Sequence, residues 1–256
     1  MNTATVIKHI VDWLTHYSET SHTKGFVVGV SGGVDSAVTS VLCALTGKNV
    51  IVVNMPILQP PSQYQRSNEH IEWLKDKFKN VTSFNVDLTS SFEQISADLS
   101  NNIQDHLTMA NVRARLRMTT LYAYAGHYGY LVAGTGNKVE DFGVGFFTKY
   151  GDGGVDISPI ADLMKTEVFS LAKELDIIQS IQAAKPTDGL WDDDRSDEDQ
   201  IGANYPELEW AMTFEGDETA ISNREQEVLA IYRKLNKANQ HKMMAIPVCE
   251  IPESLK

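Results

Sequence analysis

A glycine-rich stretch, "GVSGGVDS" at residues 29–36, directly follows a short apolar run and precedes a segment with helical apolar periodicity. Glycines let a backbone turn and approach a ligand closely, and the amides at the start of a helix attract anions. Ser31 and Ser36 add hydroxyl donors. The stretch therefore predicts a phosphate-binding loop, although a plain strand–turn–helix junction could also use glycines in this way.

An aspartate lies in this loop where a common nucleotide-binding motif has a lysine. The lysine of that motif neutralises the β and γ phosphates, whereas Asp35 would repel a bare polyphosphate. The acid becomes favourable when a cation lies between, since Mg²⁺ is typically held by one or two carboxylates together with phosphate oxygens. Asp35 therefore favours a nucleotide bound as its magnesium complex.

Four other stretches carry residues that could bind ligands. They are "NVRARLRM" at 111–118, "GTGNKVEDFGVGFFTKYGDGGVD" at 134–156, "KPTDGLW" at 185–191 and "NQHKMMAIPVCEIP" at 239–252. Arginines 113 and 117 share a helix face and Arg115 lies roughly opposite, in a chain that is otherwise acidic. Each stretch taken alone is also compatible with solvated surface.

The elements that must position these residues alternate between strand and helix. Short apolar runs predict strands, and apolar residues at helical spacing predict helices. We expect strands at 26–30, 49–56, 81–88 and 130–134, and helices at 3–19, 34–45, 65–79, 108–127, 165–175 and 222–239. This alternation predicts a doubly wound α/β fold, a parallel sheet flanked by helices, with a helical C-terminal extension in a single domain of residues 1–256.

Composition narrows the class of protein. The chain has 256 residues, 42% of them hydrophobic, and a net charge of −12, which disfavours a general nucleic-acid-binding surface. Cys43 and Cys249 stand far apart without a metal-binding spacing, so we expect neither zinc nor a disulfide. No run is long and apolar enough for a signal peptide or a membrane span, and we expect a cytoplasmic protein with no nucleic-acid or membrane partner.

Together the motifs resemble the ammonia-dependent NAD⁺ synthetases, within the superfamily of ATP pyrophosphatases. The resemblance covers roughly residues 5 to 250 in the order of the family, and "SGGVDS", "NVRARLRM" and "FFTKYGDGGVD" carry most of it. It implies a ligase that joins deamido-NAD⁺ and ammonia, with ATP cleaved to AMP and diphosphate. It also implies a homodimer with the dinucleotide at the subunit interface.

The resemblance assigns roles to individual positions. ATP would contact Gly29, Val30, Ser31, Gly32, Gly33, Val34, Asp35, Ser36, Thr135, Lys165 and Thr187. Mg²⁺ would bind Asp35 and Glu140. Deamido-NAD⁺ would contact Arg115, Lys149, Asp156, His241 and Lys242, the last two from the partner subunit if the substrate lies between subunits.

The implied chemistry needs further groups. Adenylation would turn the nicotinate carboxylate into an electrophile, and ammonium would then need a base. Asp152 and Asp156 are the candidates, with Asp152 expected to be catalytic, although it could merely shape a glycine-rich turn. An acyl-adenylate must also be shielded from water. We therefore expect a lid at residues 188–200, "DGLWDDDRSDEDQ", with Trp191 as the apolar contact that holds it closed.

One segment departs from the family pattern, and it leaves the substrate open. The family usually has "DE-x-x-LG-x-x-Y" after the lid, whereas this chain has "DEDQIGANYPELEWAM", with Pro206 restraining the approach to the next helix. Amidation of nicotinate mononucleotide therefore stays an alternative. The chain is too short for an amidohydrolase domain, but a separate glutaminase could supply ammonia.

Two other classes compete with this interpretation. Other ATP pyrophosphatases, such as GMP synthetase or tRNA-thiolating enzymes, share the loop. They would require a different C-terminal domain, or a basic surface and catalytic cysteines. A non-enzymatic nucleotide-binding module of the universal-stress type would not need two magnesium carboxylates. On spacing alone, without the resemblance, the sequence indicates only an enzyme that uses ATP.

Overall fold

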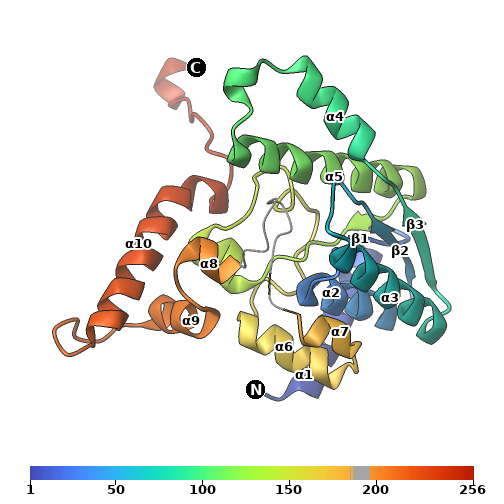
Figure 1. Ribbon diagram of the computed structural model, residues 1–256, viewed down its shortest axis with the longest axis horizontal. Helices are drawn as coiled ribbons and strands as arrows, with labels where there is room; N and C mark the ends of the chain where they lie inside the picture. Colours follow the sequence, from blue (N-terminus) through green and yellow to red (C-terminus); the bar gives the residue numbers. More distant parts are fainter. Residues whose placement is uncertain (185, 187–196) are drawn as a thin grey trace.

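A parallel sheet with helices on both faces organises the computed structural model, which describes residues 1–184, 186 and 197–256. The sheet lies to the right in Figure 1. Its strands run in the order β3-β2-β1-β4 and all pair in parallel. They are β1 (Gly25–Gly29), β2 (Asn49–Asn54), β3 (Val81–Asn85) and β4 (Leu131–Val132). The predicted parallel sheet flanked by helices is confirmed.

Both faces of the sheet are covered because successive strand residues point to opposite sides. Phe26 and Val28 pack into one apolar cluster, with helices α1 (Thr3–Thr20), α2 (Val34–Leu45), α3 (Pro61–Lys77) and α6 (Lys165–Glu174). Val27 points the other way, into a second cluster with α4 (Thr89–Asp98) and α5 (His106–Tyr128). The sheet is thus the middle layer of three.

The predicted helices and strands are present, but several of them begin or end at other residues than predicted. Strands predicted at 49–56 and 81–88 end earlier, and the strand predicted at 130–134 shortens to two residues followed by a single bridge between Ala133 and Ile157. Helix α3 begins at Pro61 because proline fits a first helical turn. Helix α4 was not predicted, since its polar sequence has little apolar periodicity.

The C-terminal part forms a helical cluster of its own. It contains α8 (Asp197–Ile201), α9 (Tyr205–Thr213) and α10 (Asn223–Met243), after the short α7 (Gln179–Gln182). Apolar residues of these helices, among them Leu208 and Val228, pack against Val139 and Val144. Those two belong to a π-helix, Lys138–Val144, where no helix or strand was predicted from the sequence. The predicted helical extension is confirmed, and it packs directly on this π-helix.

Short 3₁₀ helices at Asn101–Ile103 and Glu253–Leu255 complete the secondary structure of the described residues. A search of the same residues finds no helix whose length and apolar character would let it cross a membrane. Cys43 is buried and Cys249 is exposed, and both are free thiols.

A histidine is sealed inside the layer between α2 and α3. His70 is fully buried, its Nε2 lies 2.9 Å from the Ser40 hydroxyl, and its ring stacks on Trp73. The Ser40 hydroxyl donates to Ala37 O, so the His70 ring donates from Nε2, and its Nδ1 has no hydrogen-bond partner among the described residues. Burial lowers the pKa of His70 from its ordinary value of 6.5 to about 4.

We expect this histidine to make the fold sensitive to acid. Because the pKa of the folded state lies below that of the unfolded chain, the contribution of neutral His70 is fully present above pH 6.5 and is lost as the pH falls toward 4. The free energy of unfolding should drop by about 2 kcal/mol from this group between neutrality and about pH 5. Urea unfolding at the two pH values measures it.

The matched variant is His70→Phe, which keeps the stack on Trp73 and removes the titrating ring. Its unfolding free energy should vary less with pH than that of the wild type, by about the same 2 kcal/mol. Equal pH dependence in both proteins would contradict this assignment.

Candidate active site

The glycine-rich loop connects β1 to α2 at the carboxyl edge of the sheet. Ser31 and Ser36 face each other across it, with 3.2 Å between their hydroxyl oxygens, and the Ser31 hydroxyl also accepts from the Gly33 amide. Gly33 caps helix α2 without any side-chain bond to the first-turn amides. Those amides are therefore available to an anion at the helix N-terminus.

One loop position has to be glycine. Gly32 has a φ of +84°, and a Cβ added there would lie 2.9 Å from the carbonyl oxygen of Gln63. The backbone of the loop thus packs directly against the backbone of helix α3, and α3 covers one side of the glycine-rich loop.

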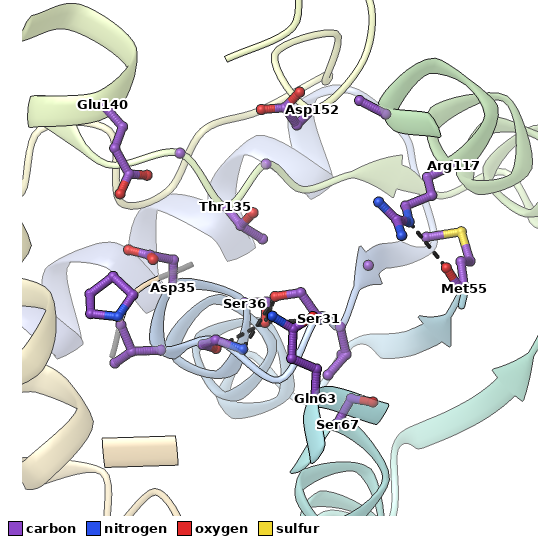
Figure 2. Close-up of a pocket in the computed structure, with 18 of the residues that line it drawn as sticks. Ser31, Asp35, Ser36, Met55, Gln63, Ser67, Arg117, Thr135, Glu140 and Asp152 are labelled. Atoms are coloured by element: carbon purple, nitrogen blue, oxygen red, sulfur yellow. Dashed lines mark hydrogen bonds between the residues drawn. The ribbon is translucent and has the colours of Figure 1, made fainter. Parts of the chain in front are cut away.

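The loop forms one wall of a cavity, and the end of β4 forms another. The strands follow the order β3-β2-β1-β4, so the strand order reverses between β1 and β4, and ligands of open α/β sheets bind at such a point. Residues 29–31, 33–36 and 133–136 line the cavity, together with Glu140, Asp152 and Lys165. Figure 2 shows Asp35, Thr135 and Glu140 on one side and Arg117 on the other.

A buried ion triad of Lys165, Asp35 and Glu140 lines this cavity. Lys165 Nζ is 2.5 Å from Asp35 Oδ2 and 2.9 Å from Glu140 Oε1, and the Lys165 side chain is only 3% exposed. Three separate parts of the chain meet here: the start of α2, the π-helix and the start of α6. Two carboxylates converge on one cation.

The electrostatics follow from burial and from this pairing. Burial raises the pKa of Asp35, and the opposing effect of the Lys165 ammonium does not fully offset it. Burial also acts to raise the pKa of Glu140, but the ammonium and the Tyr205 hydroxyl outweigh it, so the pKa of Glu140 lies below its ordinary value. The two carboxylates hold the pKa of Lys165 above its ordinary value despite burial.

Asn137 ties the two carboxylate-bearing segments together. Its Oδ1 accepts hydrogen bonds from the backbone amides of Val139 and Glu140, which caps the π-helix. Its Nδ2 donates to Asp35 Oδ1 at 3.1 Å, and the side chain is fully buried. One amide group thus orients the Asp35 carboxylate and holds the backbone that carries Glu140.

The far side of the cavity holds a second set of polar groups. Arg117 donates from Nε to Met55 O at 3.0 Å and from a terminal nitrogen to Gln59 Oε1 at 2.8 Å. Gln63 and Ser67 of α3 also line the cavity there (Figure 2). These groups offer a hydrogen-bonding surface opposite the ion triad, and Arg117 gives it a positive charge.

Asp152 lies at the mouth between these two sides. Its Oδ1 accepts from the Thr148 amide at 3.0 Å, and its carboxylate is open to the cavity. The protein surrounding the cavity raises the pKa of Asp152 above its ordinary value, an effect of burial to which Glu140 adds. A neighbouring acid, Asp141, has its pKa raised well above its ordinary value by burial and by the other carboxylates.

The residues expected to contact the dinucleotide lie outside the cavity lined by the described residues. Arg115 Nε donates to Lys149 O at 3.2 Å, and Lys149 Nζ donates to His241 O at 3.0 Å, so these three meet on the surface. Lys242 donates to Gly145 O and Phe147 O of its own chain. Asp156 accepts from the Tyr122 hydroxyl and the Val132 amide, each at 2.8 Å, and so also holds β4 to α5.

Two predictions concern residues that the structure does not describe. Thr187 and residues 188–196 of the predicted lid, Trp191 included, lie outside the described residues. The flanking residues are described: the Asp197 amide donates to Pro186 O at 3.1 Å, and both residues line the cavity.

Comparison with known proteins decides the family. The family model described as NAD synthase matches residues 6–245. The chain belongs to the NAD synthase family. Ammonia-dependent NAD⁺ synthetases among its relatives include one from Mycoplasma genitalium, 36% identical with 89% of this chain and 90% of the relative covered. One from Saccharolobus solfataricus is 37% identical, with 93% and 86% covered.

Solved structures agree with the NAD synthase fold. A structure described as NMN synthetase from Francisella tularensis is 30% identical, covers 99% of both chains and has a TM-score of 0.87. One described as NH₃-dependent NAD synthetase from Campylobacter jejuni covers 98% of this chain and 100% of its own, with a TM-score of 0.80; at 22% identity it supports the fold alone. The predicted family is confirmed.

The donor set fits the magnesium ion that the NAD synthase family resemblance implies. Asp35 and Glu140 supply two hard oxygen ligands that already converge on one cation. A search of the described residues for three or more metal-binding side chains at one place finds none. Two carboxylates are what Mg²⁺ needs when nucleotide phosphates and water complete its coordination.

Sequence reasoning missed several residues of this NAD synthase site. Asn137 lies within the quoted stretch "GTGNKVE", between Thr135 and Glu140, but nothing in its type marked it as the link to Asp35. Arg117 was singled out only as part of an arginine-rich helix. Tyr205 and Asp197 lie in the segment noted for its departure from the family pattern. Only the fold brings Tyr205 to Glu140, with Asp197 beside the Tyr205 hydroxyl.

The loop geometry predicts the effect of a single methyl group. In Gly32→Ala the new Cβ meets Gln63 O at 2.9 Å, so the loop has to move away from α3. We expect ATP binding, measured by isothermal titration calorimetry, to weaken by at least about tenfold, because the loop amides no longer converge.

Gly47→Ala is the matched control. Gly47 also has a positive φ, +74°, but a Cβ there meets nothing within 4 Å, and the residue does not line the cavity. Both variants should lose about 1–2 kcal/mol of stability from the left-handed backbone, and only Gly32→Ala should lose ATP affinity. Equal ATP affinity in the two variants would contradict the role of the loop.

Proposed function

We propose that the protein catalyses the ATP-dependent amidation of deamido-NAD⁺ with ammonia, giving NAD⁺, AMP and diphosphate. The observation that carries the proposal is the buried triad of Asp35, Glu140 and Lys165 next to a glycine-rich helix N-terminus. Membership of the NAD synthase family and the named relatives supply the substrate.

The reaction we propose begins with activation of the nicotinate carboxylate. Its oxygen attacks the α-phosphate of ATP, and diphosphate leaves toward the amides of the loop and the first turn of α2. Lys165 offsets the charge that builds up on the phosphates, as cations do in phosphoryl transfer generally. Mg²⁺, held by Asp35 and Glu140, would supply further charge neutralisation on the same oxygens.

The second step we propose is attack of ammonia on the acyl-adenylate. At neutral pH most ammonia is ammonium, which has to lose a proton before it can react. We propose that Asp152 binds the ammonium as a carboxylate and takes the proton, because this carboxylate opens into the cavity and its raised pKa makes it a stronger proton acceptor. AMP then leaves and the amide remains.

Part of the substrate site is proposed to lie between two subunits. Arg115, Lys149 and His241 meet on the surface rather than in the cavity, which is where a partner subunit could complete a dinucleotide site. We therefore propose that Arg115, Lys149, Asp156, His241 and Lys242 contact deamido-NAD⁺ in a homodimer. Thr135 and Thr187 are proposed ATP contacts.

A second candidate substrate is nicotinate mononucleotide. The Francisella tularensis structure that covers 99% of both chains with a TM-score of 0.87 is described as an NMN synthetase. The mechanism would be unchanged, because the reacting carboxylate is the same, and the surface group around Arg115 would then bind less of the substrate.

The two substrates can be separated in one experiment. The purified protein is incubated with Mg-ATP and ammonium chloride, with deamido-NAD⁺ or nicotinate mononucleotide supplied separately, and AMP and amide are followed by chromatography. We expect a kcat/KM for deamido-NAD⁺ at least about tenfold higher, a difference of about 1.4 kcal/mol in transition-state binding. Preference for the mononucleotide would establish the second candidate, and AMP from neither would contradict amidation.

Asp152→Asn in the same assay separates the two steps. Without the carboxylate, AMP should still form while the yield of amide per AMP falls and the KM for ammonium rises. A variant that makes one amide per AMP at the wild-type ammonium KM would contradict the role proposed for Asp152.

A further inference from the structure

Tyr205, the first residue of α9, reaches from the C-terminal cluster into the ion triad. Its side chain is buried, and its hydroxyl oxygen lies 2.5 Å from Glu140 Oε1 and 3.3 Å from Asp197 Oδ2. Lys165 Nζ lies over its ring, 4.8 Å from the centroid. One side chain therefore touches the carboxylate expected to hold the metal, the triad cation, and an acid at the start of α8.

The hydroxyl acts as a donor to Glu140. A phenol has one proton to give, and the shorter of its two contacts is to Glu140 Oε1. Oε1 also accepts from Lys165 at 2.9 Å, so two donors converge on a single oxygen. Rotation of the Glu140 carboxylate would break both bonds, and the pair fixes its plane.

The position of Tyr205 is itself set by the local sequence. Asn204 caps α9 by accepting from the Glu207 amide, and Glu207 returns a bond to the Asn204 amide. The Tyr205 amide donates to Glu198 of α8 at 3.0 Å, which joins α8 to the start of α9. Asp197, at the start of α8, is bonded through its own amide to Pro186. Tyr205 thus connects Glu140 to the two described residues that flank 187–196.

Apolar packing alone does not account for the hydroxyl. Tyr205 belongs to the cluster of Val139, Leu208 and Val228, in which a phenylalanine would fill nearly the same volume. Burying a hydroxyl in such a cluster costs free energy unless it is hydrogen-bonded. The partner it has found is the carboxylate that the proposed function assigns to magnesium.

We propose that Tyr205 is a positioning residue for the metal–nucleotide complex: its hydroxyl holds Glu140 in the orientation that receives the cation. The proposal rests on the proposed function for the identity of the cation and nucleotide. Its effect is on binding of Mg-ATP, before any amidation. Its failure can therefore be told apart from failure of the proposed function.

Tyr205→Phe tests it, with binding of ATP measured by calorimetry in the presence of Mg²⁺ and again in EDTA. Loss of a hydrogen bond to a charged group should weaken binding of Mg-ATP by about tenfold. Binding of metal-free ATP should change less than about twofold. In turnover assays the KM for Mg-ATP should rise more than kcat falls.

Two controls distinguish positioning from packing. Tyr232→Phe removes a hydroxyl from a partly buried tyrosine of the same cluster and should leave both affinities unchanged. In a Glu140→Gln background, Tyr205→Phe should have no further effect on the difference between Mg-ATP and ATP, because Tyr205 acts through Glu140.

Three outcomes would overturn the proposal. One is equal weakening of ATP binding with and without Mg²⁺, which would indicate a packing effect. Another is unchanged affinity for Mg-ATP. The third is a Tyr205→Phe protein that does not fold, because the hydroxyl would then be required by the fold itself.

Discussion

The contact on which the site depends is the buried bridge from Lys165 to Asp35 and Glu140. Two carboxylates this close together in a low-dielectric cavity would repel each other and raise each other's pKa. The ammonium between them makes their burial possible, at distances of 2.5 and 2.9 Å. Removal of one partner from a buried ion pair typically costs about 3–5 kcal/mol, so the bridge joins α2, the π-helix and α6 tightly.

The layers of the fold explain why these groups meet. Asp35 is carried by the first turn of α2, directly after β1, and Glu140 follows the end of the neighbouring β4. The C-terminal helices α9 and α10 lie side by side (Figure 1). They pack on the π-helix and bring Tyr205 to Glu140. The extension therefore supports the site, and the departure "ANYPELEW" lies at this contact rather than on a remote surface.

Local sequence patterns predicted the glycine-rich loop and the layered fold. Glycines and hydroxyls after an apolar run located the loop, and alternation of strand and helix predicted the layered sheet. Hydrogen bonds between residues far apart in the chain could not be predicted from such local patterns. The bond from Asn137 to Asp35 spans 102 positions and that from Tyr205 to Glu140 spans 65, and asparagine and tyrosine are common enough to carry no signal by type. Strand ends were also overestimated, because pairing, rather than apolar character, decides where β4 stops.

The central claim is that Asp35 and Glu140 act together as a pair of cation ligands, whose charge Lys165 neutralises in this structure. Thermal unfolding of Lys165→Met with and without MgCl₂ tests it most directly, with Lys138→Met, which removes a surface partner of Asp162, as the matched control. The account predicts that Mg²⁺ alone, without nucleotide, raises the Tm of Lys165→Met by several degrees more than that of the wild type or the control. An equal response to Mg²⁺ in all three proteins would contradict it.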